Sequence, residues 1–279
     1  MKDTPWKPTL SFLKKGKANT TIPFLNERIE VLWTFQIPRK RVGFQTNVQC
    51  TLTAKNKKVI GSGHAISLKK ACCIALAEAW ERRLFHFYQK IERVDISTGF
   101  AAGRTIKTAT LAAIEEYKER HLLYLASIYP EYLNSFSAKN FYQTFLVAVL
   151  KRYLPDFNLY IFNHNLGKIL LGWSLQRSIF DSIYLGSKTE SFYLRKLVYS
   201  LLSSTQDLRK TRNFLDKIPM IPKEGVIPDY KSNFVNIKTK VLYARGILPP
   251  VVFAYIPTNQ PIKLHSQDAL FKKIIYKNT

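Results

Sequence analysis

The sequence of 279 residues predicts a mixed α/β (α+β) fold in which repeated glycine-turn–helix units pack on mixed sheets. Strand-like and helix-like segments alternate along the chain, and a hydrophobic content of 46% is enough for a sizeable core. No composition shift marks a clean linker between two halves. We therefore expect one domain over residues 1–279, with residues 1–20 as a flexible basic arm.

Runs of β-branched and aromatic residues predict the strands. Residues 31–35 and 47–53 are such runs, and the polar segment 56–58 predicts a turn into a further strand that begins at Val59. Four more strands are expected in the remainder of the chain, at residues 94–97, 159–162, 168–176 and 251–256.

Hydroxyl residues followed by alanine-rich segments predict two long helices. Ser67 is expected to cap a helix over residues 68–87, and Thr105 a helix that runs to about residue 126. Two more helices are expected, at residues 141–153 and 191–209.

The charge of the chain is strongly positive. It carries 43 Lys and Arg residues against 19 Asp and Glu residues, a formal net charge of +24. Such a charge favours an anionic partner: a nucleic acid, a membrane surface, an acidic peptide or a nucleotide. Residues 61–120 differ from the rest, because they hold 10 basic and 7 acidic residues. A concentration of carboxylates in so basic a chain indicates a specific use for them.

Cysteine usage and the N-terminus bear on the compartment. Cys50, Cys72 and Cys73 are too few for a disulfide framework, and the N-terminus has no apolar segment typical of a secretory signal. We therefore expect a cytoplasmic protein. No run of about 18 apolar residues is present, which excludes a transmembrane helix. The 5 histidines are scattered without metal-ligand spacing, which argues against a histidine-based metal site.

The most informative feature is an internal repeat at an offset of 38 residues. Residues 67–82 match residues 105–120 at six of sixteen positions, and both copies follow a glycine turn, open with a hydroxyl residue and end in Glu-x-x-Glu-Arg. The identical pairs are Lys69/Lys107, Ala71/Ala109, Ala75/Ala113, Glu78/Glu116, Glu81/Glu119 and Arg82/Arg120.

Each Glu-x-x-Glu places two carboxylates side by side on a helix, where like charges repel. One such pattern is more often a solvated helix face, but its repetition favours a site. Mg²⁺ is usually held by a few carboxylates together with substrate phosphates, and arginine is the natural planar partner of a phosphate. If the two helices pack together through their alanines, the pattern predicts one metal–nucleotide site, built from Glu78, Glu81, Arg82, Glu116, Glu119 and Arg120.

The residues around both copies resemble the YcaO family of ATP-dependent enzymes, which modify peptide backbone amides. The segment from Gly61 to Arg82 is similar to the family's first glycine-led helix. The segment Ser97-Thr-Gly-Phe-Ala-Ala-Gly103, followed by Glu116-x-x-Glu-Arg120, is similar to the family's second and more specific segment. The resemblance covers residues 61–120, and the short connection between the two helices indicates a compact member.

The resemblance implies a cofactor, Mg²⁺-ATP, and roles for the repeated residues. Four glutamates would be ligands of Mg²⁺ ions that bridge the ATP phosphates: Glu78, Glu81, Glu116 and Glu119. Arg82 and Arg120 would contact phosphate or support the glutamates. The implied reaction phosphorylates an amide oxygen, a nucleophile adds to the carbonyl, and phosphate leaves. The product would be an azoline, thioamide or amidine in a ribosomal peptide such as a bacteriocin, or in a protein. A precursor peptide and a leader-recognition partner protein are the implied partners.

Two other functions stay open. The strands before Gly61, with Lys69 and Lys70 at the start of the next helix, are also similar to a double-stranded-RNA-binding module, whose lysines contact phosphates. The second copy replaces Lys70 with Thr108 but keeps both glutamates, and an acidic face does not suit RNA. A YcaO-like scaffold or partner subunit that does not use ATP is the other alternative.

Overall fold

The computed structural model describes residues 17–22, 27–36, 46–54, 57–65, 67–92, 99–129, 132–165, 167–174, 179–186, 189–203, 237–243 and 248–255. The chain divides into two compact units, Met1–Glu116 with Ile237–Tyr255 and Tyr117–Asn236 with Ile256–Thr279. Each unit is described by itself. The prediction of a single domain over residues 1–279 stays a prediction.

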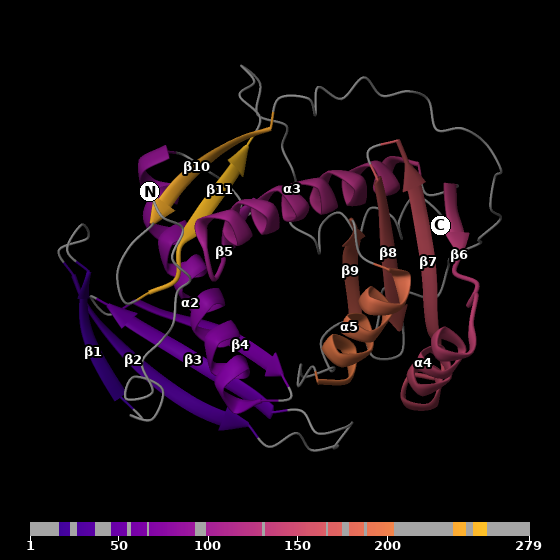
Figure 1. The fold of residues 1–279 in the computed structure, drawn as a ribbon, viewed down its shortest axis with the longest axis horizontal. Coiled ribbons are helices and arrows are strands. Elements are labelled where there is room, and N and C mark those ends of the chain that lie inside the picture. The colour runs from indigo at the N-terminus through magenta and orange to yellow at the C-terminus, as the bar shows by residue number, and fades with distance from the viewer. Residues whose placement is uncertain are drawn as a thin grey trace. The chain divides into compact units, whose positions relative to one another are not determined.

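The first unit begins with an antiparallel sheet, coloured indigo to purple in Figure 1. Consecutive strands are neighbours in this sheet, as expected when short turns join them. The strands predicted at residues 31–35, at 47–53 and from Val59 are confirmed. Residues 17–20 belong to a strand, so the predicted arm is wrong there, and residues 1–16 lie outside the described residues. The strands are β1 Lys17–Ile22, β2 Glu27–Gln36, β3 Thr46–Ala54 and β4 Lys57–Ala65.

Helix α2, Leu68–Glu92, packs on β3 and β4 and follows the predicted cap. The backbone N–H of Lys70 donates to the Oγ of Ser67 at 3.2 Å. Because glycine has no Cβ, the backbones of α2 and β4 come very close: a Cβ at Gly63 would collide with the carbonyl oxygen of Ala71. Gly61 stands in the same relation to Ala75. The small residues on both elements therefore serve the packing of helix on strand.

A second, three-stranded sheet completes the first unit and joins distant parts of the sequence. Its order is β10-β11-β5, with both pairs antiparallel. The apolar run predicted as a strand is confirmed, and the strand predicted at residues 94–97 lies outside the described residues. Trp80 of α2 packs edge-on against Tyr243, with ring centroids 5.2 Å apart. The strands are β10 Lys238–Tyr243, β11 Val251–Tyr255 and β5 Phe100–Ala102.

The second unit is built on an antiparallel sheet of order β6-β7-β8-β9. Residues of its strands that differ by one position face opposite ways. Thus Tyr160 belongs to one hydrophobic cluster of the unit, whereas Leu159 belongs to the other. The sheet is therefore covered on both faces. Its strands are β6 Leu133–Ser135, β7 Phe157–His164, β8 Gly167–Ser174 and β9 Ile179–Leu185.

Three helices cover this sheet. Helix α3, Ile106–Ile128, starts in the first unit, and its C-terminal half packs on one face of the sheet. Helices α4, Phe141–Tyr153, and α5, Glu190–Ser203, pack on the other face. The predicted bounds of α4 are confirmed, and its Asn140 cap accepts a hydrogen bond from the Gln143 backbone N–H at 2.9 Å. Residues 204–209, predicted as the end of α5, lie outside the described residues.

The prediction of mixed sheets, which contain both parallel and antiparallel strand pairs, is wrong for the described strands. Every strand pair in the described part of the chain is antiparallel. Short connections explain this for strands that follow one another directly, such as β7 and β8, since parallel neighbours need a long crossover. The pairs β5–β11 and β6–β7 are antiparallel although longer segments separate their strands. Among the helices described, none is both long and apolar enough to span a membrane.

Candidate active site

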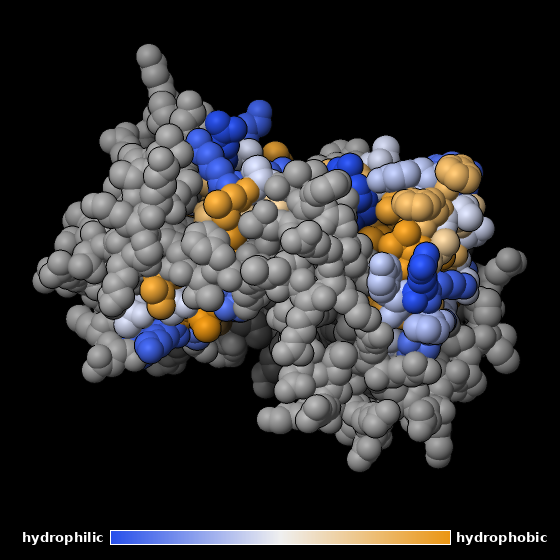
Figure 2. All heavy atoms as spheres, turned by 90° about the horizontal axis from the view of Figure 1, so that it is seen from below, coloured by the Kyte–Doolittle hydropathy of each residue, from blue (hydrophilic) through white to orange (hydrophobic). Residues whose placement is uncertain are grey.

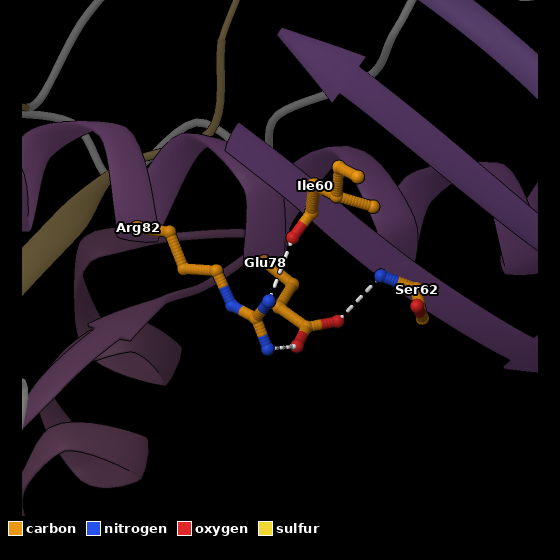
Figure 3. Close-up of polar contacts among 4 residues, drawn as sticks. All are labelled: Ile60, Ser62, Glu78 and Arg82. Atoms are coloured by element: carbon orange, nitrogen blue, oxygen red, sulfur yellow. Dashed lines mark hydrogen bonds and ion pairs between the residues drawn. The ribbon is translucent and has the colours of Figure 1, made fainter. Parts of the chain in front are cut away.

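The first Glu-x-x-Glu-Arg lies on α2, where two of its side chains turn toward β4 (Figure 3). The backbone N–H of Ser62 donates to Glu78 Oε2 at 2.6 Å. Arg82 donates from Nη1 to the carbonyl oxygen of Ile60 at 2.8 Å and from Nη2 to Glu78 Oε1 at 2.5 Å. The carboxylate and the guanidinium thus form a pair that lies along the strand.

These contacts follow from the position of β4 at the end of the described sheet. A strand in that position presents backbone N–H and C=O groups that no further strand pairs. Glu78 accepts from one such N–H, and Arg82 donates to one such C=O. The pair therefore supplies hydrogen-bond partners to backbone groups of β4, as a neighbouring strand would. Each oxygen of Glu78 receives one hydrogen bond and keeps a lone pair for another partner.

Glu81 points to a different element from Glu78. Its Oε2 accepts a hydrogen bond from the backbone N–H of Ala102, in β5, at 3.0 Å. Burial raises the pKa of the Glu81 carboxyl to about 8, the nearby Glu78 also raises it, and the Ala102 N–H and Arg82 lower it. Glu81 is therefore a carboxyl whose ionised form needs further positive charge nearby to be stable at neutral pH.

The second copy of the repeat opens as predicted. The backbone N–H of Thr108 donates to the Oγ1 of Thr105 at 3.1 Å, so Thr105 caps α3. Gly103 packs against the backbone of Ala109, as the glycines of β4 pack against α2. Both copies are therefore glycine-led helices with hydroxyl caps, as the repeat predicted.

The acids of the second copy lie in both units. Glu116 is half-buried in the first unit, whereas Glu119 and Arg120 belong to the second. In the second unit Glu119 Oε1 accepts a hydrogen bond from the Oγ of Ser182, in β9, at 2.8 Å. Ser182 is buried, so this carboxylate is held against the sheet.

Among the described elements, α2 packs against β3, β4 and β5. The packing of the two repeated helices against each other stays a prediction. Ala71, Ala75 and Ala79, the alanines of α2 that suggested helix-on-helix packing, lie against Gly61 and Gly63 of β4. The structure brings together Glu78, Glu81 and Arg82, and the assignment of all six residues to one site stays a prediction.

A divalent cation beside Glu81 would suit the chemistry of this carboxyl. A positive ion beside a buried carboxyl would stabilise its ionised form, and carboxylate oxygens suit Mg²⁺. Within the described residues, no three His, Cys, Asp or Glu side chains are placed to hold a metal together. Mg²⁺ commonly has only one or two protein carboxylates beside phosphate oxygens, so the donor set suits a metal bound with a nucleotide.

Sequence reasoning missed the groups that hold these acids. Two are backbone N–H groups, of Ser62 and Ala102, and one is the hydroxyl of Ser182. Backbone donors leave no mark in a sequence. The glycines at 61 and 63 were a signal, because they let α2 approach β4 closely enough for Glu78 and Arg82 to reach the strand.

The chain has a YcaO-like, mixed α/β fold. No family model and no curated protein matches the sequence of the chain. Among solved structures, the chain is similar to that of YcaO from Methanopyrus kandleri bound with AMPPCP and Mg²⁺. The two chains are 10% identical, the match covers 80% of this chain and 84% of that chain, and the TM-score is 0.55.

Proposed function

We propose that the chain is an ATP-dependent enzyme of the YcaO type, which activates a peptide backbone amide by phosphorylation. The observation that carries the proposal is Glu81. It is a buried carboxyl with a raised pKa, next to Glu78 and Arg82, in a fold similar to that of a protein bound with AMPPCP and Mg²⁺. Carboxyl groups with strongly raised pKa values are concentrated at functional sites, which supports the proposal.

The roles of the residues follow from their chemistry. Glu81, Glu78 and Glu116, all in the first unit, would hold Mg²⁺ through carboxylate oxygens. Arg82 would neutralise phosphate charge or orient the glutamates. When bound, Mg²⁺-ATP supplies the phosphoryl group that turns the amide oxygen into a leaving group. The backbone N–H groups of Ser62 and Ala102 fix the direction of the two carboxylates.

The substrate is a precursor peptide or a protein, and a leader-recognition partner protein presents it. Azoline, thioamide and amidine formation share the same activation step, so the nucleophile decides among them. The positive charge of the chain favours an acidic leader or partner.

Calorimetry of Mg²⁺-ATP binding, with phosphate release as the activity readout, tests this function. We expect Glu116→Gln to abolish both, because a neutral amide cannot replace the charge of a metal ligand. The matched control is Glu115→Gln, the adjacent glutamate of α3 outside the repeated motif, which should bind and turn over like the wild type. Circular dichroism checks that both variants fold.

Two outcomes would replace the proposal. Failure of the intact protein to bind Mg²⁺-ATP, with or without a peptide substrate, would favour a YcaO-like scaffold. Submicromolar binding of duplex RNA that survives Glu116→Gln but is lost with Lys69→Ala and Lys70→Ala would favour RNA recognition, since both lysines are exposed at the start of α2.

A further inference from the structure

The outward faces of α4 and α5 carry exposed aromatic side chains. Leu146 and Leu150 of α4 are buried against the sheet, and residues on the other side of the helix point away from it. Phe141 and Phe145 stand on that other side, one helical turn apart, with 87% and 54% of their surface exposed. They form an apolar stripe that the core of the unit does not use.

Helix α5 adds an aromatic residue and a cation to this surface. Tyr193 and Leu194 are buried against the same face of the sheet, whereas Phe192 is exposed. The guanidinium carbon of Arg195 lies 5.6 Å from the centroid of the Phe192 ring, within the range of a cation–π contact. Figure 2 shows, at its right, hydrophobic residues exposed among strongly hydrophilic ones.

Two polar contacts hold the N-terminal ends of α4 and α5 together. Lys139, just before α4, pairs with Glu190 in the first turn of α5, with 3.0 Å between Nζ and Oε1. The Nε2 of Gln143, a buried side chain, donates to the Oγ of Ser191 at 3.2 Å. The surface is therefore preformed, which lowers the entropic cost of binding a partner.

Exposed cations lie on the same two helices as the aromatic residues. Arg152 is on the same side of α4 as Phe145, two turns further on, and Lys196 lies next to Arg195 on α5. Glu190 is the only acidic residue in the two helices, and it is paired with Lys139. Within the described residues, no carboxylate pairs with Arg152, Arg195 or Lys196. The aromatic–basic face consists of Phe141, Phe145, Arg152, Phe192, Arg195 and Lys196.

We propose that the aromatic–basic face docks an acidic amphipathic helix of a peptide or protein partner. An apolar stripe with one-turn spacing matches the stripe of a second helix, and the flanking cations match carboxylates on its polar side. Single-stranded RNA is less well matched, because bases need ring faces spread along a groove. The docking does not depend on ATP, so it goes beyond the proposed enzymatic function.

Fluorescence anisotropy of the full chain with a labelled designed peptide tests the docking. The peptide has about 20 residues, long enough to form a helix, with leucines on one face and glutamates beside them. A peptide of the same composition, with its leucines scattered around the helix, is the ligand control. We expect the amphipathic peptide to bind at least about tenfold more tightly than the scattered one.

The protein variants separate the apolar from the charged contribution. Phe141→Ala with Phe145→Ala should weaken binding by about tenfold or more, as truncation of central aromatic residues does. Arg195→Glu with Lys196→Glu should abolish binding, and a peptide with lysines in place of its glutamates should restore it. The controls are Leu111→Ala and Lys58→Glu, an exposed apolar residue and an exposed cation elsewhere, which should bind like the wild type.

Three results would overturn the proposal. The first is equal binding of both peptides, or no binding at all. The second is a dimer in sedimentation experiments that Phe141→Ala with Phe145→Ala dissociates, since a second copy would then cover the face. The third is tighter binding of a poly-uridine oligonucleotide than of the peptide, lost in the same variants.

Discussion

The two copies of the repeat begin alike and differ in what holds their acids. Each helix follows a glycine packed against helix backbone and starts with a hydroxyl cap. On α2, Glu78 and Glu81 accept hydrogen bonds from backbone N–H groups. On α3, Glu119 accepts one from the side chain of Ser182.

This difference separates two ways to position a carboxylate. A backbone donor is present whatever residue occupies its position, apart from proline, so the fold itself aims Glu78 and Glu81. A side-chain donor depends on one residue, and a single substitution removes it. The first copy should therefore tolerate changes at Ser62 and Ala102 that keep the chain geometry, whereas the second copy should be sensitive at Ser182.

The largest expected loss of stability comes from separating α2 and β4. Their close approach also lets the backbone N–H of Ser62 reach Glu78. In Gly63→Val the new Cβ would meet the backbone of Ala71 and lie 2.6 Å from the Ala75 nitrogen. We expect a loss of roughly 3 kcal/mol of unfolding free energy, measured by urea denaturation. Ser62→Ala is the control, because neighbouring side chains on a strand point to opposite faces. A Gly63→Val protein as stable as this control would contradict the close packing.

The next prediction concerns the pH dependence of the unfolding free energy, to which Glu81 should contribute. Because its folded pKa is about 8, above the unfolded value, the folded state holds a proton that the unfolded state has released. Stability should therefore be greatest below the unfolded pKa and fall as the pH rises to about 8, by up to about 1.4 kcal/mol per pH unit.

Glu81→Gln removes this titration and tests its origin. The variant should lose most of the slope, because its side chain has no proton to release, and it should be more stable than the wild type near pH 8. Urea unfolding at several pH values in metal-free buffer measures both. An unchanged slope in Glu81→Gln would assign the pH dependence to another group.

Ser182→Ala tests the side-chain donor of the second copy. We expect a loss of about 1 kcal/mol of unfolding free energy, because the half-buried carboxylate of Glu119 loses a hydrogen-bond donor. Ser62→Ala, which keeps the N–H that donates to Glu78, should cost less than about 0.5 kcal/mol. Equal losses in the two variants would remove the distinction between the copies.

The smallest effect is expected for the pair that lies along β4. The side chains of Arg82 and Glu78 are 53% and 32% exposed, so water screens their attraction. A double-mutant cycle with Glu78→Ala and Arg82→Ala should give a coupling free energy below about 1 kcal/mol, further reduced by salt. A coupling several times larger would mean that the pair contributes more to stability than its exposure allows.

Local features of the fold could be predicted from the sequence. The caps at Ser67 and Thr105 and the bounds of α4 depend on neighbouring residues and on apolar spacing, which a sequence displays directly. The glycine-led start of both long helices followed from the repeat.

The arrangement around the candidate site could not be predicted in the same way. The alanines of α2 indicated close packing, but a small residue does not specify whether its partner is a helix or a strand, and the partner is β4. The contact of Glu81 with Ala102 joins residues 21 positions apart through a backbone N–H, which no residue type encodes. For the same reason the raised pKa of Glu81 could not be predicted from its charge pattern.

The pair formed by Glu78 and Arg82 also bears on aggregation and on how such motifs persist. Unprotected strand edges recruit other chains, and charged side chains placed along an edge oppose this. Loss of either residue would expose backbone groups of Ile60 or Ser62 to intermolecular pairing. Protection of the strand edge would therefore favour Glu78 and Arg82 whether or not the proposed nucleotide site is used. The contact of Glu81 with Ala102 of β5 does not protect this edge, so in this chain Glu81 bears more directly on the proposed site than Glu78 and Arg82 do.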